Sequence, residues 1–389
     1  MRIACVHQGY ELYGSDRSFV ESVAALRAAY PDAEIDVVLP RGGPIVSLIE
    51  RSETRISFEP IWVLRRQAIW RLATAGLASL PAALWRAAQR LRASDLVYIN
   101  TSVVADHILA ARFFRDKALL HIHEIPEASA LKILRAMVLW SDAEVVFNSQ
   151  ATRAAFALPE NRRTHIVYNG IAGPPAFEPV TYDGARPLRI LMLGRISRIK
   201  GQEVLLDAIA ALPPHIRRRL QLRIVGSAFE NAERERALAA RIKDMQLDER
   251  VSLEPFAADA SPLYRWADVV VVPSCRPESL GRVAIEAMAF GRPPIVSAIG
   301  GLTEVVEDGR SGWFVPPGDA AALADRLQML IENPSAWRDF AAAGRARYQE
   351  RFSSEAAAAA LFAIVDAKLR RSSGRGSAGK PPPTTVDAP

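Results

Sequence analysis

The strand-and-helix pattern of this chain starts twice, and a stretch rich in proline and glycine separates the two runs. Residues 172–187, AGPPAFEPVTYDGARP, show no hydrophobic periodicity and are typical of a linker. Short apolar runs that alternate with helical periodicity precede it at 2–8, 34–40, 94–100, 118–125, 143–149 and 165–170, and follow it at 188–194, 220–226, 251–256, 268–274, 293–298 and 312–316. This alternation predicts two doubly wound α/β domains, each built on a parallel sheet that helices cover on both faces.

The length of 389 residues agrees with two domains, since one ordinary hydrophobic core does not extend over so long a chain. The predicted organisation is an N-terminal domain at 1–175, a linker at 176–187, a C-terminal domain at 188–350, a helix at 351–370 that packs back toward the N-terminal domain, and a disordered tail at 371–389. Ligands of such sheets bind at the carboxyl ends of the strands, so the cleft between the two domains is the expected site.

The composition limits the class of protein. A net charge of +6 suits an anionic ligand or an anionic membrane surface, but it is too diffuse to indicate nucleic acid. Cys5 and Cys275 are far apart in the sequence and form neither a disulfide framework nor a metal-ligand cluster. The N-terminus lacks the pattern of a signal peptide, and the longest uncharged run, 72–85, is too short for a membrane span. We therefore expect a cytoplasmic protein.

The glycine-rich turn at 9–16, GYELYGSD, has the glycine spacing of a P-loop. Ser15 and Asp16 stand where the lysine and the serine or threonine of a P-loop would be, so this turn disfavours a nucleoside triphosphatase. No strand is followed by G-x-G-x-x-G, which disfavours a dinucleotide dehydrogenase. Two interpretations remain: a simple tight turn, or a loop in which the backbone of Gly14 lets a ligand approach closely.

Two cations follow the first strand of the second domain. Arg195 and Lys200 lie in the turn between that strand and the next helix. A planar guanidinium and a point-like ammonium at this place can together hold a diphosphate without a metal ion. The alternative is two solvated basic side chains.

Two carboxylates stand eight positions apart in PESLGRVAIEAMAFGRPP, residues 277–294. Glu278 precedes a predicted helix and suits the hydroxyls of a hexose, whereas Glu286 lies within that helix and suits a ribose diol. Gly281 and its neighbours at the helix N-terminus can offer backbone amides to phosphate. The alternative for Glu286 is a helical ion-pair face, which its apolar neighbours disfavour.

These elements resemble the retaining glycosyltransferase family 4, whose members have the two-domain GT-B fold. The resemblance covers about residues 1–370 and rests on GRISRIKG, IVGSAF, YRWADVVVVPS and the long stretch 277–319, with YGSDRS, HIHE, FNSQAT and VYNGI in the first domain. It implies a GT-B fold: two Rossmann-like domains that face each other across a cleft, with the acceptor side at 1–175 and the nucleotide-sugar side at 188–350. It also implies transfer of a sugar from a nucleotide-diphosphate sugar with retained configuration.

Carried over by position, the resemblance implies two catalytic residues, His123 and Glu278. It implies donor-binding residues at Gly14, Arg195, Lys200, Ser279, Leu280, Gly281, Arg282 and Glu286, no metal ligand, and no cofactor apart from the nucleotide-diphosphate sugar. The sequence departs from the family where E-S-L-G replaces the usual motif and where Tyr13-Gly14 replaces Gly-Gly. His121 and His123 share a strand face, so periodicity does not separate them, and a core histidine remains the alternative for His123.

The mechanism that these residues favour needs no divalent metal. No Asp-x-Asp cluster is present, so cations and helix dipoles would stabilise the leaving diphosphate. We favour attack of the acceptor hydroxyl on the same face, with a covalent intermediate as the alternative.

Residues 61–94 contain six arginines, three tryptophans and no acid. Such a segment suits a peripheral contact with an anionic membrane on the inner face of the plasma membrane, and it would fit a saccharide or lipid-linked saccharide acceptor. The alternative is a helix pair whose arginine stems lie over the domain surface.

The function with the most support from the sequence is a hexosyltransferase of bacterial cell-surface polysaccharide or glycolipid synthesis. Two alternatives remain: another GT-B enzyme, such as a sugar phosphorylase or sugar-nucleotide epimerase, and a non-catalytic protein that binds sugar nucleotides.

Overall fold

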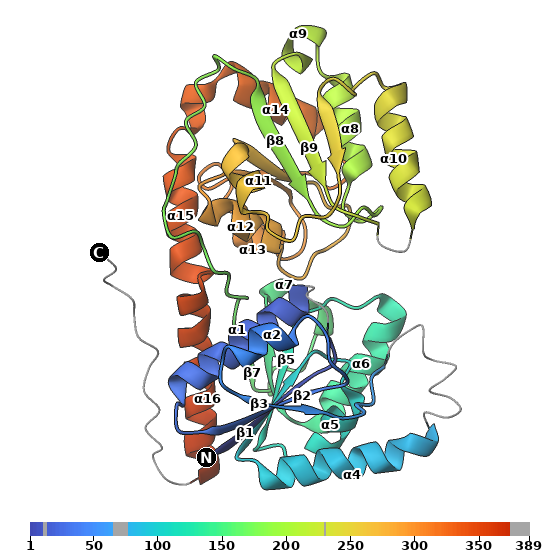
Figure 1. Ribbon diagram of the computed structural model, residues 1–389, viewed down its shortest axis with the longest axis vertical. Helices are drawn as coiled ribbons and strands as arrows, with labels where there is room; N and C mark the ends of the chain where they lie inside the picture. Colours follow the sequence, from blue (N-terminus) through green and yellow to red (C-terminus); the bar gives the residue numbers. More distant parts are fainter. Residues whose placement is uncertain (11–13, 65–76, 229–230, 374–389) are drawn as a thin grey trace. The chain divides into compact units, whose positions relative to one another are not determined.

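The computed structural model describes residues 1–10, 14–64, 77–228 and 231–373, which form two compact units (Figure 1). Unit 1 comprises Met1–Gly170 and the chain from Ser354 onward, and unit 2 comprises Ile171–Ser353. The boundary lies five residues before the predicted end of the N-terminal domain at 175, since the backbone N–H of Ile171 donates to the carbonyl of Phe352 at 3.0 Å and ties residue 171 to unit 2.

Unit 1 contains a seven-stranded parallel sheet in the order β3-β2-β1-β4-β5-β6-β7. Its strands are β1 Arg2–His7, β2 Glu34–Leu39, β3 Arg55–Phe58, β4 Leu96–Asn100, β5 Ala118–Ile122, β6 Glu144–Phe147 and β7 Thr164–Ile166. Sequence analysis missed β3. This edge strand is short, and none of its four residues is fully buried, so it lacks the apolar run that marks the other strands.

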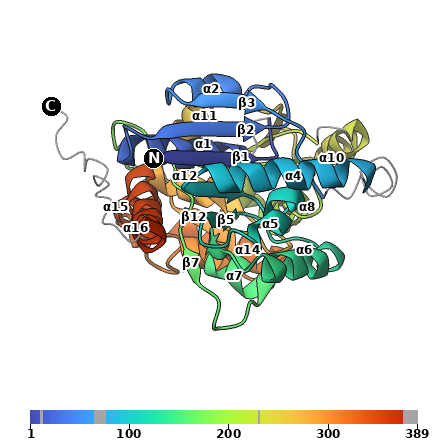
Figure 2. The same cartoon turned by 90° about the horizontal axis from the view of Figure 1, so that it is seen from below.

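Helices cover both faces of the sheet of unit 1, and they are α1 Gly14–Ala29, α2 Val46–Glu50, α4 Leu77–Ala93, α5 Ala105–Ala111, α6 Ala128–Ser141, α7 Gln150–Phe156 and α16 Ser354–Ser373. Alternate residues of β1 face opposite cores, because Ile3 packs with α1, α2 and α16, whereas Ala4 packs with α4 to α7. Figure 2 shows α4, α5 and α6 next to one another.

The helix α16 brings the C-terminal part of the chain back to unit 1. Leu361, Val365 and Leu369 are buried in the same core as Ile3. The helix continues through residues 371–373, which the composition assigned to the disordered tail, and Arg371 there pairs with Glu144 at 2.9 Å. The rest of the predicted tail, 374–389, lies outside the described residues.

Unit 2 contains a six-stranded parallel sheet in the order β10-β9-β8-β11-β12-β13. Its strands are β8 Leu188–Leu193, β9 Leu220–Val225, β10 Val251–Glu254, β11 Val269–Val272, β12 Pro294–Ser297 and β13 Trp313–Val315. Its helices are α8 Gln202–Ala211, α9 Pro214–Arg217, α10 Ala232–Asp244, α11 Ser261–Trp266, α12 Arg282–Ala289, α13 Leu302–Val305, α14 Ala320–Glu332, the 3₁₀ turn η3 Pro334–Trp337 and α15 Phe340–Arg351.

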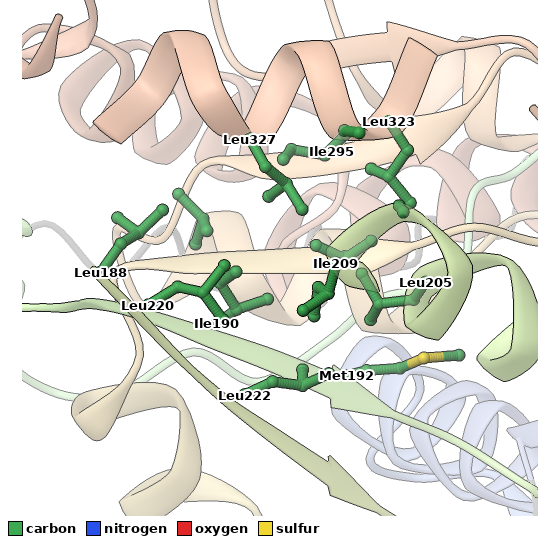
Figure 3. Close-up of a cluster of buried hydrophobic side chains, with 14 of the residues drawn as sticks. Leu188, Ile190, Met192, Leu205, Ile209, Leu220, Leu222, Ile295, Leu323 and Leu327 are labelled. Atoms are coloured by element: carbon green, nitrogen blue, oxygen red, sulfur yellow. The ribbon is translucent and has the colours of Figure 1, made fainter. Parts of the chain in front are cut away.

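The core of unit 2 joins β8 to the helices that cover one face of the sheet. Ile190 and Met192 of β8 lie near Leu205 of α8 and Leu327 of α14 (Figure 3). In both sheets the strand order reverses direction at the centre, between β1 and β4 in unit 1 and between β8 and β11 in unit 2. These are the topological switch points at which doubly wound sheets bind ligands, and they confirm the predicted α/β class.

No helix within the described residues has the length and apolar character that crossing a membrane requires.

Candidate functional site

The loop between β8 and α8 carries the two predicted phosphate-binding cations of unit 2. The ammonium of Lys200 lies 2.8 Å from Oε1 of Glu278. The next residue, Gly201, has φ of +77°, and a Cβ there would lie 1.9 Å from the carbonyl oxygen of Pro273. Only glycine therefore fits at 201, and this close approach holds Lys200 against the loop that follows β11.

Glu278 lies in that second loop and is held from several directions. Its Oε1 accepts hydrogen bonds from Lys200 and from the hydroxyl of Ser274, and its carbonyl accepts one from the N–H of Gly301 at 2.8 Å. The side chain retains 14% exposure, so a ligand can reach it. Sequence analysis assigned Lys200 and Glu278 to one ligand; the structure brings them into direct contact.

The start of α12 offers backbone amides beside Glu278. Gly281 is the N-cap residue with φ of +98°, and a Cβ there would lie 2.4 Å from Cδ2 of Leu302. Leu280 is buried, with 1% exposure, and anchors the turn, whereas Ser279 is half-buried. The first N–H groups of an α-helix have no partner within the helix, and its dipole favours an anion at this end.

Glu286 lies one turn into α12, where two side chains contact its carboxylate. The hydroxyl of Tyr264 donates to Oε2 at 2.7 Å, and Arg282, four residues earlier, lies 3.6 Å from Oε1. The ion pair with Arg282 is the alternative that the sequence left open for Glu286. Sequence analysis missed Tyr264, because nothing in its spacing from Glu286 indicates that the end of α11 lies against α12.

Arg195 is the second residue of the β8–α8 loop. Its carbonyl accepts a hydrogen bond from the side chain of Gln202 at 3.1 Å, and its guanidinium is exposed. The structure therefore leaves this charge available to a ligand.

In unit 1, His123 is 6% exposed and belongs to a buried polar network. The strand β5 ends at Ile122, so His123 is the first residue after the strand. Its Nε2 lies 2.8 Å from Oδ1 of Asn100, and its Nδ1 lies 2.9 Å from Oδ1 of Asn169. The side chains of Asn100 and Asn169 therefore hold the His123 ring in place.

The same network continues to β1 and α1. Nδ2 of Asn100 lies 2.9 Å from Nδ1 of His7, and Nε2 of His7 lies 2.7 Å from Oδ1 of the buried Asp16. Sequence analysis missed His7, Asn100 and Asn169. Their common signal is that each stands at or just after the carboxyl end of a parallel strand, where doubly wound sheets place functional groups.

His121 and His123 lie on the same face, as the strand alternation predicted, but His121 has a different hydrogen-bond partner. The two ring centroids are 3.9 Å apart, and the hydroxyl of Tyr98 contacts Nδ1 of His121 at 2.5 Å. Burial, together with the neighbouring His123, lowers the pKa of His121 well below its usual value. His121 is therefore neutral at pH 7.

Gly14 is the exposed first residue of α1, and its carbonyl accepts a hydrogen bond from the hydroxyl of Ser18 at 3.0 Å. Tyr13 lies outside the described residues. Within the described parts of the chain, no group of three or more His, Cys, Asp or Glu side chains is arranged to hold a metal ion.

The basic segment 61–94 is described at 61–64 and 77–94. Arg90 packs onto the unit as the alternative interpretation expected, since it is 11% exposed and lies 2.6 Å from Glu59. Trp85, in contrast, is 65% exposed on α4. Trp70, Arg65, Arg66 and Arg71 lie outside the described residues.

Residues 184–347 match the family model of glycosyl transferases group 1. The chain is 40% identical over 178 residues to the D-inositol 3-phosphate glycosyltransferase of Nocardioides sp., which is 43% of this chain and 38% of that protein. It is 39% identical over 161 residues to the protein of the same name from Frankia alni, which is 40% of this chain and 39% of that protein. The matches thus span about two fifths of each relative's length, and they support the group 1 glycosyltransferase family for unit 2.

Solved structures cover nearly the whole chain. The Anabaena protein HepE in complex with UDP superposes with a TM-score of 0.79 at 24% identity, over 94% of this chain and all of that one. The sucrose-phosphate synthase of Thermosynechococcus elongatus superposes with a TM-score of 0.69 at 24% identity, over 95% and 98%. These likenesses, with two parallel Rossmann-like sheets, show that the protein has the GT-B fold.

Proposed function

We propose that this protein is a retaining glycosyltransferase that moves a hexose from a nucleotide-diphosphate sugar to a hydroxyl group of a saccharide or lipid-linked saccharide. The observation that carries the proposal is the contact between Lys200 and Glu278 beside the N-terminus of α12. A sugar phosphate linkage has an anion on one side and hydroxyl groups on the other. A cation, backbone amides and a carboxylate in one place are complementary to that linkage.

In the proposed site, Arg195 and Lys200 bind the diphosphate together with the backbone of residues 279–282. Glu278 accepts hydrogen bonds from the sugar, and Glu286 from the ribose. As the bond to the sugar breaks, negative charge grows on the leaving diphosphate, where the cations and the dipole of α12 stabilise it. Since these groups supply the positive charge, we expect a chelator to leave the transfer rate unchanged.

For retention, we favour attack by the acceptor hydroxyl on the face from which the diphosphate leaves. The hydroxyl proton then passes to the leaving phosphate oxygen. We propose that His123, which Asn100 and Asn169 hold in place, contacts the sugar, and that the backbone of Gly14 lies near the substrates.

The relatives support this proposal by name, as both are called D-inositol 3-phosphate glycosyltransferases. The Anabaena HepE protein has been solved with UDP and with UDP-glucose. We therefore place UDP-sugars first among the candidate donors.

We also propose that unit 1 contacts an anionic membrane in the course of cell-surface polysaccharide or glycolipid synthesis. Four large apolar side chains are exposed on or beside the adjacent helices α4, α5 and α6, by 53–77%: Trp85, Phe113, Ile133 and Trp140. The exposed Lys132 and the partly exposed Arg112 lie in the same helices or next to them. Tryptophans with basic residues suit a headgroup boundary.

For the membrane proposal, Trp85→Gln with Trp140→Gln should reduce co-sedimentation with phosphatidylglycerol vesicles severalfold. Vesicles of neutral phosphatidylcholine serve as the control. Equal binding of both lipids, or no loss in the double variant, would contradict a membrane contact at this surface.

The function itself is tested by the thermal stability of the full chain with UDP-, GDP-, ADP- and dTDP-sugars. A ligand that binds only the folded state at 100 times its Kd stabilises it by about 2.7 kcal/mol, so one nucleotide series should raise the melting temperature. The donor found in this way is then incubated with candidate acceptors, and NMR of the product should show the donor's anomeric configuration. No shift with any nucleotide sugar, or an inverted product, would overturn the proposal.

A further inference from the structure

Four arginines line one cavity of about 570 Å³ in unit 2. Arg195 and Arg198 come from the loop between β8 and α8, Arg234 comes from the first turn of α10, and Arg276 comes from the loop after β11. The other lining residues are uncharged: Ile196, Ser197, Ile199, Ala228, Asn231 and Cys275. Among the described residues that line it, none is acidic, so this arginine cavity concentrates positive charge.

The described residues do not neutralise the four guanidinium groups. Within the described parts of the chain, none of them forms a side-chain hydrogen bond or an ion pair. Other arginines of unit 2 are paired at 2.5 Å, as Arg241 is with Asp207. Like charges around one space repel each other, and an anion between them would relieve that repulsion.

Among the described residues, acidic side chains line the neighbouring cavity and not the arginine cavity. A second cavity of about 490 Å³ shares Arg198 and Arg234 with the arginine cavity and is also lined by Glu203 and Glu233. Arg241 lines this second cavity too and is already paired. The excess of unpaired cations therefore belongs to the arginine cavity.

The proposed diphosphate contacts account for only one of the four arginines. Arg195 lines the arginine cavity, whereas Lys200, Glu278 and Glu286 do not. Arg276 stands two residues before Glu278, which is proposed to bind the transferred sugar. The three remaining arginines therefore have no role in the proposed diphosphate contacts, and one of them, Arg276, is close in the chain to the proposed sugar-binding residue.

We propose that Arg198, Arg234 and Arg276 bind a second oxyanion, beyond the donor's diphosphate, so that one of the two substrates is an acidic saccharide. This inference rests on the proposed function, whose substrate class it narrows. Planar guanidinium groups match the two oxygens of a carboxylate or a phosphate. The oxyanion has two possible sources: a carboxylate on the donor sugar, or a phosphate on the acceptor.

The test compares three forms of the full chain by calorimetry. They are the wild type, the cavity variant R198A/R234A/R276A, and a control variant, R218A/R236A/R338A, which removes the same charge from exposed arginines that do not line the cavity. The donor arm measures UDP-glucuronate against UDP-glucose. The acceptor arm measures glucose 6-phosphate against glucose without any nucleotide.

In at least one arm, the wild type and the control variant should bind the acidic ligand at least tenfold more tightly than its neutral counterpart. The cavity variant should reduce that preference below about twofold, and the arm in which this happens identifies the source of the oxyanion. Absence of a preference in both arms, or a preference that survives in the cavity variant, would overturn the inference. Binding of UDP alone tests the proposed function separately. If the wild type binds no nucleotide, the proposed function is overturned, whereas the acceptor arm, which contains no nucleotide, still tests this inference.

Discussion

At the scale of single residues, the proposed phosphate-binding lysine is paired with the proposed sugar-binding carboxylate. The contact of 2.8 Å between Lys200 and Glu278 brings opposite charges together. A donor that places phosphate on Lys200 and hydroxyls on Glu278 would replace one interaction by two. The pair therefore holds the two side chains in position.

Lys200→Ala should weaken binding of a nucleoside diphosphate by about 10- to 100-fold. A hydrogen bond to a charged group contributes about 1.5–3 kcal/mol, and each 1.4 kcal/mol is tenfold in affinity. Calorimetry measures the loss, with Lys243→Ala, an exposed lysine on α10, as the matched control. An unchanged Kd for Lys200→Ala would remove Lys200 from the phosphate site.

Tyr264 should act as a positioning residue for Glu286, since its hydroxyl donates to Oε2 at 2.7 Å. Tyr264→Phe should weaken binding of a ribonucleoside diphosphate by about 3- to 10-fold, as expected for one hydrogen bond. The same substitution should leave the affinity for the 2′,3′-dideoxynucleoside diphosphate unchanged, because that ligand has no diol for Glu286.

The control for Tyr264 is Tyr182→Phe. Tyr182 is a buried tyrosine of unit 2 whose hydroxyl has no hydrogen-bond partner within the described residues. If Tyr264→Phe lowers the affinity for both nucleotides equally, the role of Tyr264 is structural and the proposed positioning role is wrong.

At the scale of elements, α16 is held to unit 1 by an ion cluster as well as by its apolar face. The buried Glu144 of β6 accepts from Lys368 at 3.3 Å, from Arg371 at 2.9 Å and from His165 at 2.7 Å. Burial alone would raise the pKa of Glu144, but the His165 hydrogen bond and the charges of Lys368 and Arg371 outweigh it and lower the pKa to about 2.

The stability of unit 1 should therefore depend on pH through Glu144. A carboxyl with a lowered pKa in the folded state contributes its full stabilisation above the unfolded value of 4.5 and loses it as the pH falls toward about 2. Glu144→Gln should lower the free energy of unfolding by about 3 kcal/mol at pH 7, because Lys368 stays buried without its partner. Its urea midpoint should also fall less between pH 4.5 and pH 3 than that of the wild type. A parallel decline in both proteins would contradict this assignment.

Several elements show where prediction from the sequence ended. The central strands were predicted because they are buried on both faces and read as apolar runs. The strand β3 was not predicted, because it is a half-exposed edge strand. The end of α16 was placed too early because the composition around residue 371 is polar, whereas the helix there is extended by the contact of Arg371 with Glu144.

At the scale of the whole molecule, local sequence patterns were enough for the fold but not for all of the site. The sequence marks Arg195, Lys200, Glu278 and Glu286 as candidates because they follow strands or lie at or within the start of a helix at fixed spacings. It does not mark Tyr264 or the network of His7, Asn100 and Asn169, because their contacts join elements far apart in the chain. Periodicity within one segment of the sequence does not indicate contacts between segments that are far apart in the chain.

The central claim is that Glu278 and Glu286 divide one ligand, and calorimetry on two variants with two ligands tests it most directly. Glu286→Gln should lower the affinity for the bare nucleoside diphosphate and for the intact donor alike, because both carry the ribose. Glu278→Gln should leave the affinity for the nucleoside diphosphate unchanged and lower only the affinity for the donor. If the contact tightens in the transition state, kcat should fall more than KM rises. Equal losses for both ligands in Glu278→Gln would contradict the account.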